Sequence, residues 1–152
     1  MTSLPGRLTL VGHPVAHSLS PRFQNAALRA AGIDLEYEAT DVPPDRLTAF
    51  AHELAEVGAA GNVTVPHKES FAACCARLSP IARRTGAVNT FWTEDGSLCG
   101  DNTDVGGFDL AVRASVGLPE HPFEMVLLGA GGAASGVLAA AERWGAARVR
   151  VW

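Results

Sequence analysis

The sequence is poor in charge, and the charges that it has are scattered. Only 18% of its 152 residues are Asp, Glu, Lys or Arg, and they sum to a formal net charge of −4. Lys and Arg form no cluster of the kind that binds a phosphate backbone, so we expect no nucleic-acid partner. Because 47% of the residues are hydrophobic, the chain can fill a core and is not expected to be disordered.

Long apolar runs and zinc-type cysteine patterns are also missing. No stretch approaches the roughly 20 apolar residues that cross a bilayer, and the amino terminus has no charged start followed by an apolar segment. We therefore expect a soluble, cytoplasmic protein without a membrane partner. The three cysteines match no metal-ligand spacing and are expected to be reduced, and His13, His17 and His67 offer no defensible ligand geometry. We expect no metal site.

The chain does have an alternation of strand-like and helix-like patterns, which predicts an α/β fold with a sheet covered by helices. Strands are expected at residues 8–11, 35–41, 62–65, 88–92 and 97–100. Helices are expected at residues 21–31, 45–57, 68–78 and 104–116, with a short helix after Ser79-Pro80. The dipeptide Asp95-Gly96 is a strong signal for the hairpin turn between the last two strands. We expect residues 1–116 to form a three-layer α/β/α domain.

A second unit is expected after a linker at residues 117–122, which is rich in Gly and Pro. Its pattern is an apolar strand at 123–128, a glycine-rich turn from Gly129, a helix at 133–144 and a strand at 149–152. This order opens a Rossmann-type doubly wound fold, in which glycines let a pyrophosphate approach the amino terminus of the helix. Taken alone, such a glycine pattern is a weak indication. We expect residues 123–152 to be the truncated start of such a domain.

The most informative polar segment runs from Gly61 to Lys68, around the exit of a predicted strand. Alternation along the strand puts Asn62 and Thr64 on one face. Pro66 ends the strand because it has no N–H to donate, and Lys68 follows at the start of a helix. An amine at this junction can bind hydroxyls and transfer a proton, although an isolated Lys is more often simply solvated.

Three further segments place polar side chains at predicted strand ends. They are residues 12–21 (GHPVAHSLSP), 86–90 (GAVNT) and 100–104 (GDNTD). Together with residues 61–68, they resemble the substrate signature of the shikimate dehydrogenases, in which S-x-S-P, N-x-T-x-P-x-K, G-A-V-N-T and N-T-D occur in this order. The glycine turn extends the resemblance over essentially the whole chain.

The resemblance implies an NADP-dependent oxidoreductase that reversibly reduces 3-dehydroshikimate to shikimate, in the chorismate pathway to aromatic amino acids. It implies that Ser18 and Ser20 bind the substrate carboxylate, and that Thr64 and Asn89 contact ring hydroxyls. Lys68 and Asp104 would contact the substrate and form a catalytic dyad that handles the proton. The cofactor NADP would be held by Gly129, Ala130, Gly131, Gly132 and Ala133.

Some of these residues also have simpler interpretations. Ser20 precedes Pro21 and could cap a helix, which is worth about 1 kcal/mol. Asp104 could cap the next helix, although its pairing with the lysine motif favours the dyad. Asn62 is equally well explained as a ligand or as a partner of backbone groups, and Asn102 and Thr103 are assigned to turn structure. The resting position of the dyad's proton stays open, because burial lowers the pKa of an amine and a neighbouring carboxylate raises it.

The chain departs from the family in ending before the basic loop that holds the 2′-phosphate of NADP. We therefore expect a fragment of a longer enzyme, inactive alone, and the preference for NADP over NAD rests on the resemblance. Two other functions stay open: a quinate/shikimate dehydrogenase of relaxed specificity, and a shikimate-binding module without catalysis. The oligomeric state is also open, with a homodimer as one option.

Overall fold

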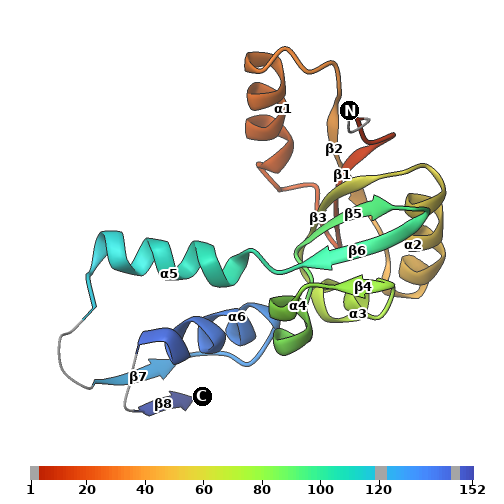
Figure 1. Ribbon diagram of the computed structural model, residues 1–152. Coiled ribbons are helices and arrows are strands. Elements are labelled where there is room, and N and C mark those ends of the chain that lie inside the picture. The colour runs from red at the N-terminus through yellow and green to blue at the C-terminus, as the bar shows by residue number, and fades with distance from the viewer. Residues whose placement is uncertain (1–3, 119–122, 145–147) are drawn as a thin grey trace.

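The computed structural model describes residues 4–118, 123–144 and 148–152, and it contains one large mixed sheet and one small parallel sheet (Figure 1). The large sheet has the strand order β2-β1-β3-β5-β6-β4. Its strands are β1 (Leu8–Gly12), β2 (Tyr37–Asp41), β3 (Ala60–Val63), β4 (Arg77–Leu78), β5 (Thr90–Glu94) and β6 (Ser97–Asp101). Within the described residues, no helix is long and apolar enough to cross a membrane.

Helices connect these strands and cover both faces of the large sheet. They are α1 (Ser20–Ala30), α2 (Leu47–Glu56) after the 3₁₀ turn η1 (Pro44–Arg46), α3 (Lys68–Ala72) and α4 (Pro80–Thr85). Helix α5 (Asp104–Ser115) follows β6 and leads away from the large sheet (Figure 1). Consecutive residues of a strand face opposite ways. Val11 accordingly packs in the main core with Leu54 of α2, whereas Leu10 packs with Tyr37 and Leu28 of α1. The predicted sheet covered by helices is therefore confirmed.

Strand β5 alone runs against its neighbours, and this reversal positions the polar segments. It pairs antiparallel with both β3 and β6, whereas β1 pairs parallel with β2 and β3. Asp95 and Gly96 have φ angles of 52° and 70°, so they form the predicted hairpin turn. The residue before β5, Asn89, and the residue after β6, Asn102, consequently lie at the same edge of the sheet, where β1 and β3 also end.

Several predicted boundaries were wrong, among them that of the strand expected at 88–92, which spans Thr90–Glu94. The strand expected at 62–65 spans Ala60–Val63, and the strand expected from residue 35 begins at Tyr37. The helix expected at 68–78 ends at Ala72, since residues 77–78 form β4, which pairs parallel with β6. Backbone bonds from Ala76 to Leu98 and from Ser79 to Gly100 hold this segment extended. Tertiary pairing overrides local helical periodicity here.

The carboxyl-terminal elements are β7 (Glu124–Leu127), α6 (Gly132–Ala141), the 3₁₀ turn η2 (Glu142–Trp144) and β8 (Arg148–Val151). Strands β7 and β8 pair in parallel, and α6 lies beside α5 (Figure 1). The predicted order of strand, glycine turn, helix and strand is confirmed. Residues 119–122 of the predicted linker lie outside the described residues, so the domain boundary stays a prediction.

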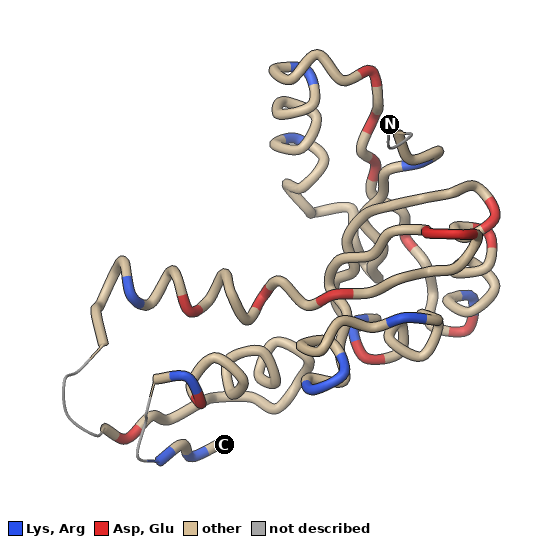
Figure 2. The backbone as a smooth tube through the Cα atoms, in the orientation of Figure 1, with Lys and Arg blue, Asp and Glu red and all other residues tan. Residues whose placement is uncertain are grey.

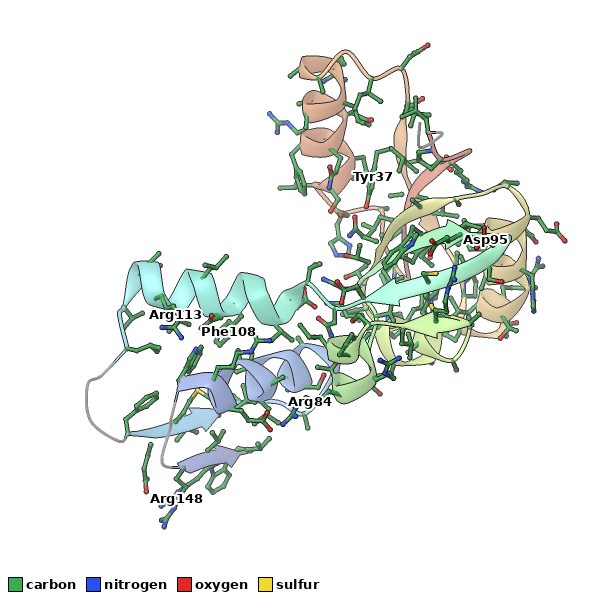
Figure 3. All side chains as sticks on the ribbon, in the orientation of Figure 1. Tyr37, Arg84, Asp95, Phe108, Arg113 and Arg148 are labelled. Carbon is green, nitrogen blue, oxygen red and sulfur yellow. The ribbon has the colours of Figure 1, made fainter. Side chains whose placement is uncertain are left out.

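Side chains of α5 join it to the carboxyl-terminal elements. Phe108 projects from α5 toward this segment (Figure 3), and its ring centroid lies 5.6 Å from that of Trp144. The indole N–H of Trp144 donates to Asp109, and Arg84 of α4 pairs with Glu142. Basic and acidic residues are interspersed along the backbone (Figure 2).

Candidate functional site

Lys68 and Asp104, the two residues predicted to form a dyad, are in contact. Each is the first residue of a helix, α3 and α5, and Lys68 Nζ lies 2.7 Å from Asp104 Oδ2. The Lys68 side chain is 17% exposed and that of Asp104 is 35% exposed. The backbone N–H of Val88 donates to the carbonyl of Lys68 at 2.8 Å, which ties α3 to the segment before β5. A charged hydrogen bond of this length is among the stronger ones in proteins.

Asn89 completes the surroundings of the Asp104 carboxylate. Its Nδ2 donates to Asp104 Oδ1 at 2.7 Å and to Thr103 Oγ1 at 3.0 Å. Its Oδ1 accepts from the backbone N–H of Thr103 at 2.8 Å, which fixes the orientation of the amide. Both oxygens of Asp104 therefore accept from donors, and the N-cap position of α5 is held by Thr103, which makes no side-chain cap bond. The alternative use of Asp104 as a helix cap is wrong.

A chain of hydrogen bonds leads from the sheet to Asn89. Tyr37 Oη donates to Asn62 Oδ1 at 2.8 Å, and Asn62 Nδ2 donates to Thr90 Oγ1 at 3.2 Å. Thr90 Oγ1 in turn donates to Asn89 Oδ1 at 3.1 Å. The Asn62 amide also donates to the Asn89 carbonyl at 3.2 Å. The polar groups of Asn62 are thus satisfied within the protein, which favours its interpretation as a structural residue.

Tyr37 was missed by the sequence analysis, although a signal for it exists. It is the only tyrosine of the chain, and it is 4% exposed at the start of β2. A buried tyrosine normally finds a partner for its hydroxyl. Burial raises the pKa of Tyr37 to about 12, so the phenol stays protonated and can donate to Asn62 over the ordinary pH range.

Ser18 and Thr64 line one cavity of about 580 Å³ at the end of β1, together with His13 and His17. Ser18 Oγ accepts from the backbone N–H of Ser20 at 3.2 Å. Ser20 lies outside the lining of this cavity and is the first residue of α1. Leu19 holds the N-cap position without a side-chain cap, so the prediction that Ser20 could cap this helix is wrong.

The glycine turn lies against the dyad. Gly131, Gly132 and Ala133 line a cavity of about 280 Å³ whose other wall includes Lys68 and Glu69. A Cβ added at Gly132 would lie 3.5 Å from the Cβ of Lys68, so a larger side chain there would fill this cavity.

The other two residues of the predicted cofactor set, Gly129 and Ala130, stand between β7 and α6. Gly129 has a φ of +107°, which favours glycine. The N-cap residue of α6 is Gly131, which has no side chain to cap the first turn. A pyrophosphate fits such a helix terminus.

Of the three histidines considered for a metal, His17 lines the cavity at the end of β1, and the side chains of the other two have hydrogen-bond partners. His67 is buried, and its Nε2 lies 2.6 Å from the Val42 carbonyl, which anchors the start of α3. His13 Nδ1 lies 2.6 Å from Asp41 Oδ1. In the part of the chain that the structure describes, no group of three or more His, Cys, Asp or Glu could hold a metal ion.

The fold and the site together define an α/β substrate-binding domain whose polar cluster faces a nucleotide-type glycine turn. The family model for the shikimate dehydrogenase substrate binding domain matches residues 10–91, more than half of the chain. The chain belongs to this family.

Relatives and solved structures agree with this assignment. The shikimate dehydrogenase (NADP⁺) of Rubrobacter xylanophilus is 47% identical over 152 residues, which cover 99% of this chain and 52% of that protein. A Thermus thermophilus shikimate 5-dehydrogenase structure in complex with NADP(H) and shikimate is 42% identical with a TM-score of 0.85, covering 96% of this chain and 55% of that one. The Aquifex aeolicus shikimate dehydrogenase has a TM-score of 0.89 at 34% identity, covering 100% and 57%. The chain spans about half the length of the curated relatives it matches.

Proposed function

We propose that this chain is the substrate-binding part of a shikimate dehydrogenase, and that the whole protein reversibly reduces 3-dehydroshikimate to shikimate with NADPH. The observation that carries the proposal is the position of Lys68. Its amine lies 2.7 Å from the Asp104 carboxylate, and its side chain lines the cavity that it shares with the glycine turn. A proton donor therefore faces the place where a dinucleotide would bind.

The residues suit a ketone reduction. NADPH, when bound, supplies the hydride for the ketone carbon, and negative charge develops on the carbonyl oxygen. Lys68, as an ammonium, donates a hydrogen bond and then a proton to that oxygen. Asp104 holds the amine in place and is itself held by Asn89. In the oxidation of shikimate, the same pair accepts the hydroxyl proton.

The remaining predicted contacts belong to the same proposal. Ser18 and Ser20 would bind the substrate carboxylate with their hydroxyl groups, and Thr64 and Asn89 would contact ring hydroxyls. Ser18 and Thr64 share one cavity, which supports a common ligand. The turn from Gly129 to Ala133 would hold the pyrophosphate of NADP. We also propose the domain division at residues 116 and 123, a cytoplasmic location and, as one option, a homodimer.

The decisive experiment compares the full-length enzyme that contains this chain with its Lys68→Ala variant. Wild-type enzyme should oxidise shikimate with NADP. The variant should lose most turnover, on the order of 100- to 10,000-fold, while shikimate affinity stays within about tenfold. Near-normal turnover in the variant would refute the role of Lys68. Wild-type enzyme that binds shikimate without oxidising it would instead support a non-catalytic binding module, and comparable rates with quinate would support the relaxed-specificity alternative.

A second readout uses the fact that Lys68 is the only lysine in this chain. Lysine-directed acylation followed by mass spectrometry of the peptide that contains it therefore reports on one side chain of the site. Shikimate should protect Lys68 from acylation, whereas the amino-terminal amine of the same chain should react at an unchanged rate. Equal reactivity with and without shikimate would contradict the predicted contact.

A further inference from the structure

Asn102 is a buried amide that joins two segments of the site. Its side chain is 1% exposed. Its Oδ1 accepts from the backbone N–H of Asp104 at 3.1 Å. Its Nδ2 donates to the Ala87 carbonyl at 3.2 Å and to Thr85 Oγ1 at 3.1 Å. Both the donor and the acceptor group of this amide are therefore engaged within the protein, Nδ2 twice and Oδ1 once.

These bonds exceed what a turn requires. An Asn that turns the chain needs only its oxygen, which accepts from the backbone two residues later. The bond to Asp104 fulfils that role. The two donated bonds instead reach Ala87 and Thr85, fifteen and seventeen residues earlier in the chain. They hold the segment that carries Asn89 at a fixed separation from the first residue of α5.

The fixed separation matters because Asp104 has two partners on different segments. Lys68 Nζ and Asn89 Nδ2 each lie 2.7 Å from one of its oxygens. Asp104 can contact Lys68 and Asn89 at once only if the start of α5 is held at the right distance from the segment before β5, which carries Asn89. Asn102 is bonded to both segments. It donates to the carbonyl of Ala87, two residues before Asn89, and accepts from the N–H of Asp104 itself.

We infer that Asn102 is a positioning residue for the Lys68 and Asp104 pair, acting through the backbone of both neighbouring segments. Its bonds go to Asp104, Ala87 and Thr85, so it acts through these groups. The inference deepens the proposed function and rests on it for its kinetic consequence. A displacement of about 1 Å in a catalytic group can lower turnover by on the order of 100-fold.

The test uses Asn102→Ser in the full-length enzyme, because serine keeps an oxygen that can accept from the N–H of Asp104 and loses both donated bonds. We expect a fall in kcat of about 10- to 100-fold with a smaller change in KM, and an altered pH profile of kcat. Thr93→Val is the matched control, since it removes one side-chain bond to a backbone carbonyl, that of Ala59 at 2.9 Å, in the same sheet. It should lower thermal stability and leave the kinetics unchanged.

Folding and function are separated by measurements made alongside. Thermal midpoints identify a variant that fails to fold, and Asn102→Gln then provides a variant with the same functional groups on a longer side chain. The acylation rate of Lys68 measures the pairing with Asp104 without any turnover, and we expect it to rise several-fold in Asn102→Ser. If the wild-type enzyme does not oxidise shikimate, the proposed function is refuted. The acylation rate of Lys68 then still tests whether Asn102 positions the pair of Lys68 and Asp104. A folded Asn102→Ser enzyme with wild-type kcat, pH profile and acylation rate would overturn the inference.

Discussion

Ionising Tyr37 should destabilise the folded domain at high pH, and the ionisation can be followed at this one residue. The side chain is 4% exposed, and its hydroxyl donates to Asn62 Oδ1 at 2.8 Å. Burial raises its pKa from 10.0 to about 12. Since Tyr37 is the only tyrosine in the chain, the near-ultraviolet absorbance of phenolate reports on this residue alone.

The direction and size of the effect follow from the pKa difference. The folded state has the higher pKa, so the stabilisation that comes from keeping the phenol protonated is fully present below pH 10 and is lost as pH rises from 10 towards 12. Two pKa units correspond to about 3 kcal/mol. A domain of ordinary stability has roughly 5 to 15 kcal/mol in total, so this loss is a large fraction.

The assay combines absorbance titration with urea unfolding at several pH values. Phenolate should form in the folded chain only near pH 12 or together with unfolding, and the free energy of unfolding should fall between pH 10 and 12. Tyr37→Phe is the control: it should lose about 1 kcal/mol at neutral pH, for the missing hydrogen bond, and lack the steep alkaline fall. Phenolate formation near pH 10 in a chain that is still folded would refute the reasoning.

Two further predictions concern other parts of the chain. Gly12→Ala should weaken shikimate binding by about tenfold, or about 1.4 kcal/mol. The reason is that the added Cβ would lie 2.6 Å from Thr64 Cγ2 and displace that side chain. Calorimetry that finds unchanged shikimate affinity in a folded variant would contradict this prediction. Asp109 has a lowered pKa because it accepts from the indole N–H of Trp144 and from Arg113. The stability from its carboxylate is therefore present above the unfolded pKa and is lost as pH falls through the folded one. Urea unfolding between neutral pH and pH 2 should show a shallower acid loss for Asp109→Asn, and identical pH dependence would count against the contact.

The proximity of the polar segments was predicted more accurately than the local structure around them. The four polar segments were identified from residue types at strand ends, and the structure brings Lys68, Asn89 and Asp104 into contact. These three are separated by up to 36 residues in the chain. Their contact follows from the reversed strand β5, which a hairpin signal at Asp95-Gly96 already indicated.

Other features depend on tertiary pairing and left little trace in the sequence. Strand β4 is two residues long, and it forms because β6 offers an edge to pair with. The links from Tyr37 to Asn62 and from Asn102 to Thr85 each join segments that only folding brings together. Ser20 has the residue type of a helix cap, but Leu19 occupies the cap position. Residue type alone cannot locate such contacts.

The hairpin of β5 and β6 also bears on how the chain can vary. Both strands have their site-bearing ends at one edge of the sheet, whereas the turn at Asp95 and Gly96 lies at the opposite edge, far from α5 (Figure 3). Residues added at that turn would extend into solvent without altering the spacing of Asn89 and Asp104. The hairpin therefore separates an end whose geometry is constrained by the contact of Asn89 with Asp104 from a distal end that can accept insertions, so the turn could be lengthened while that contact stays in place.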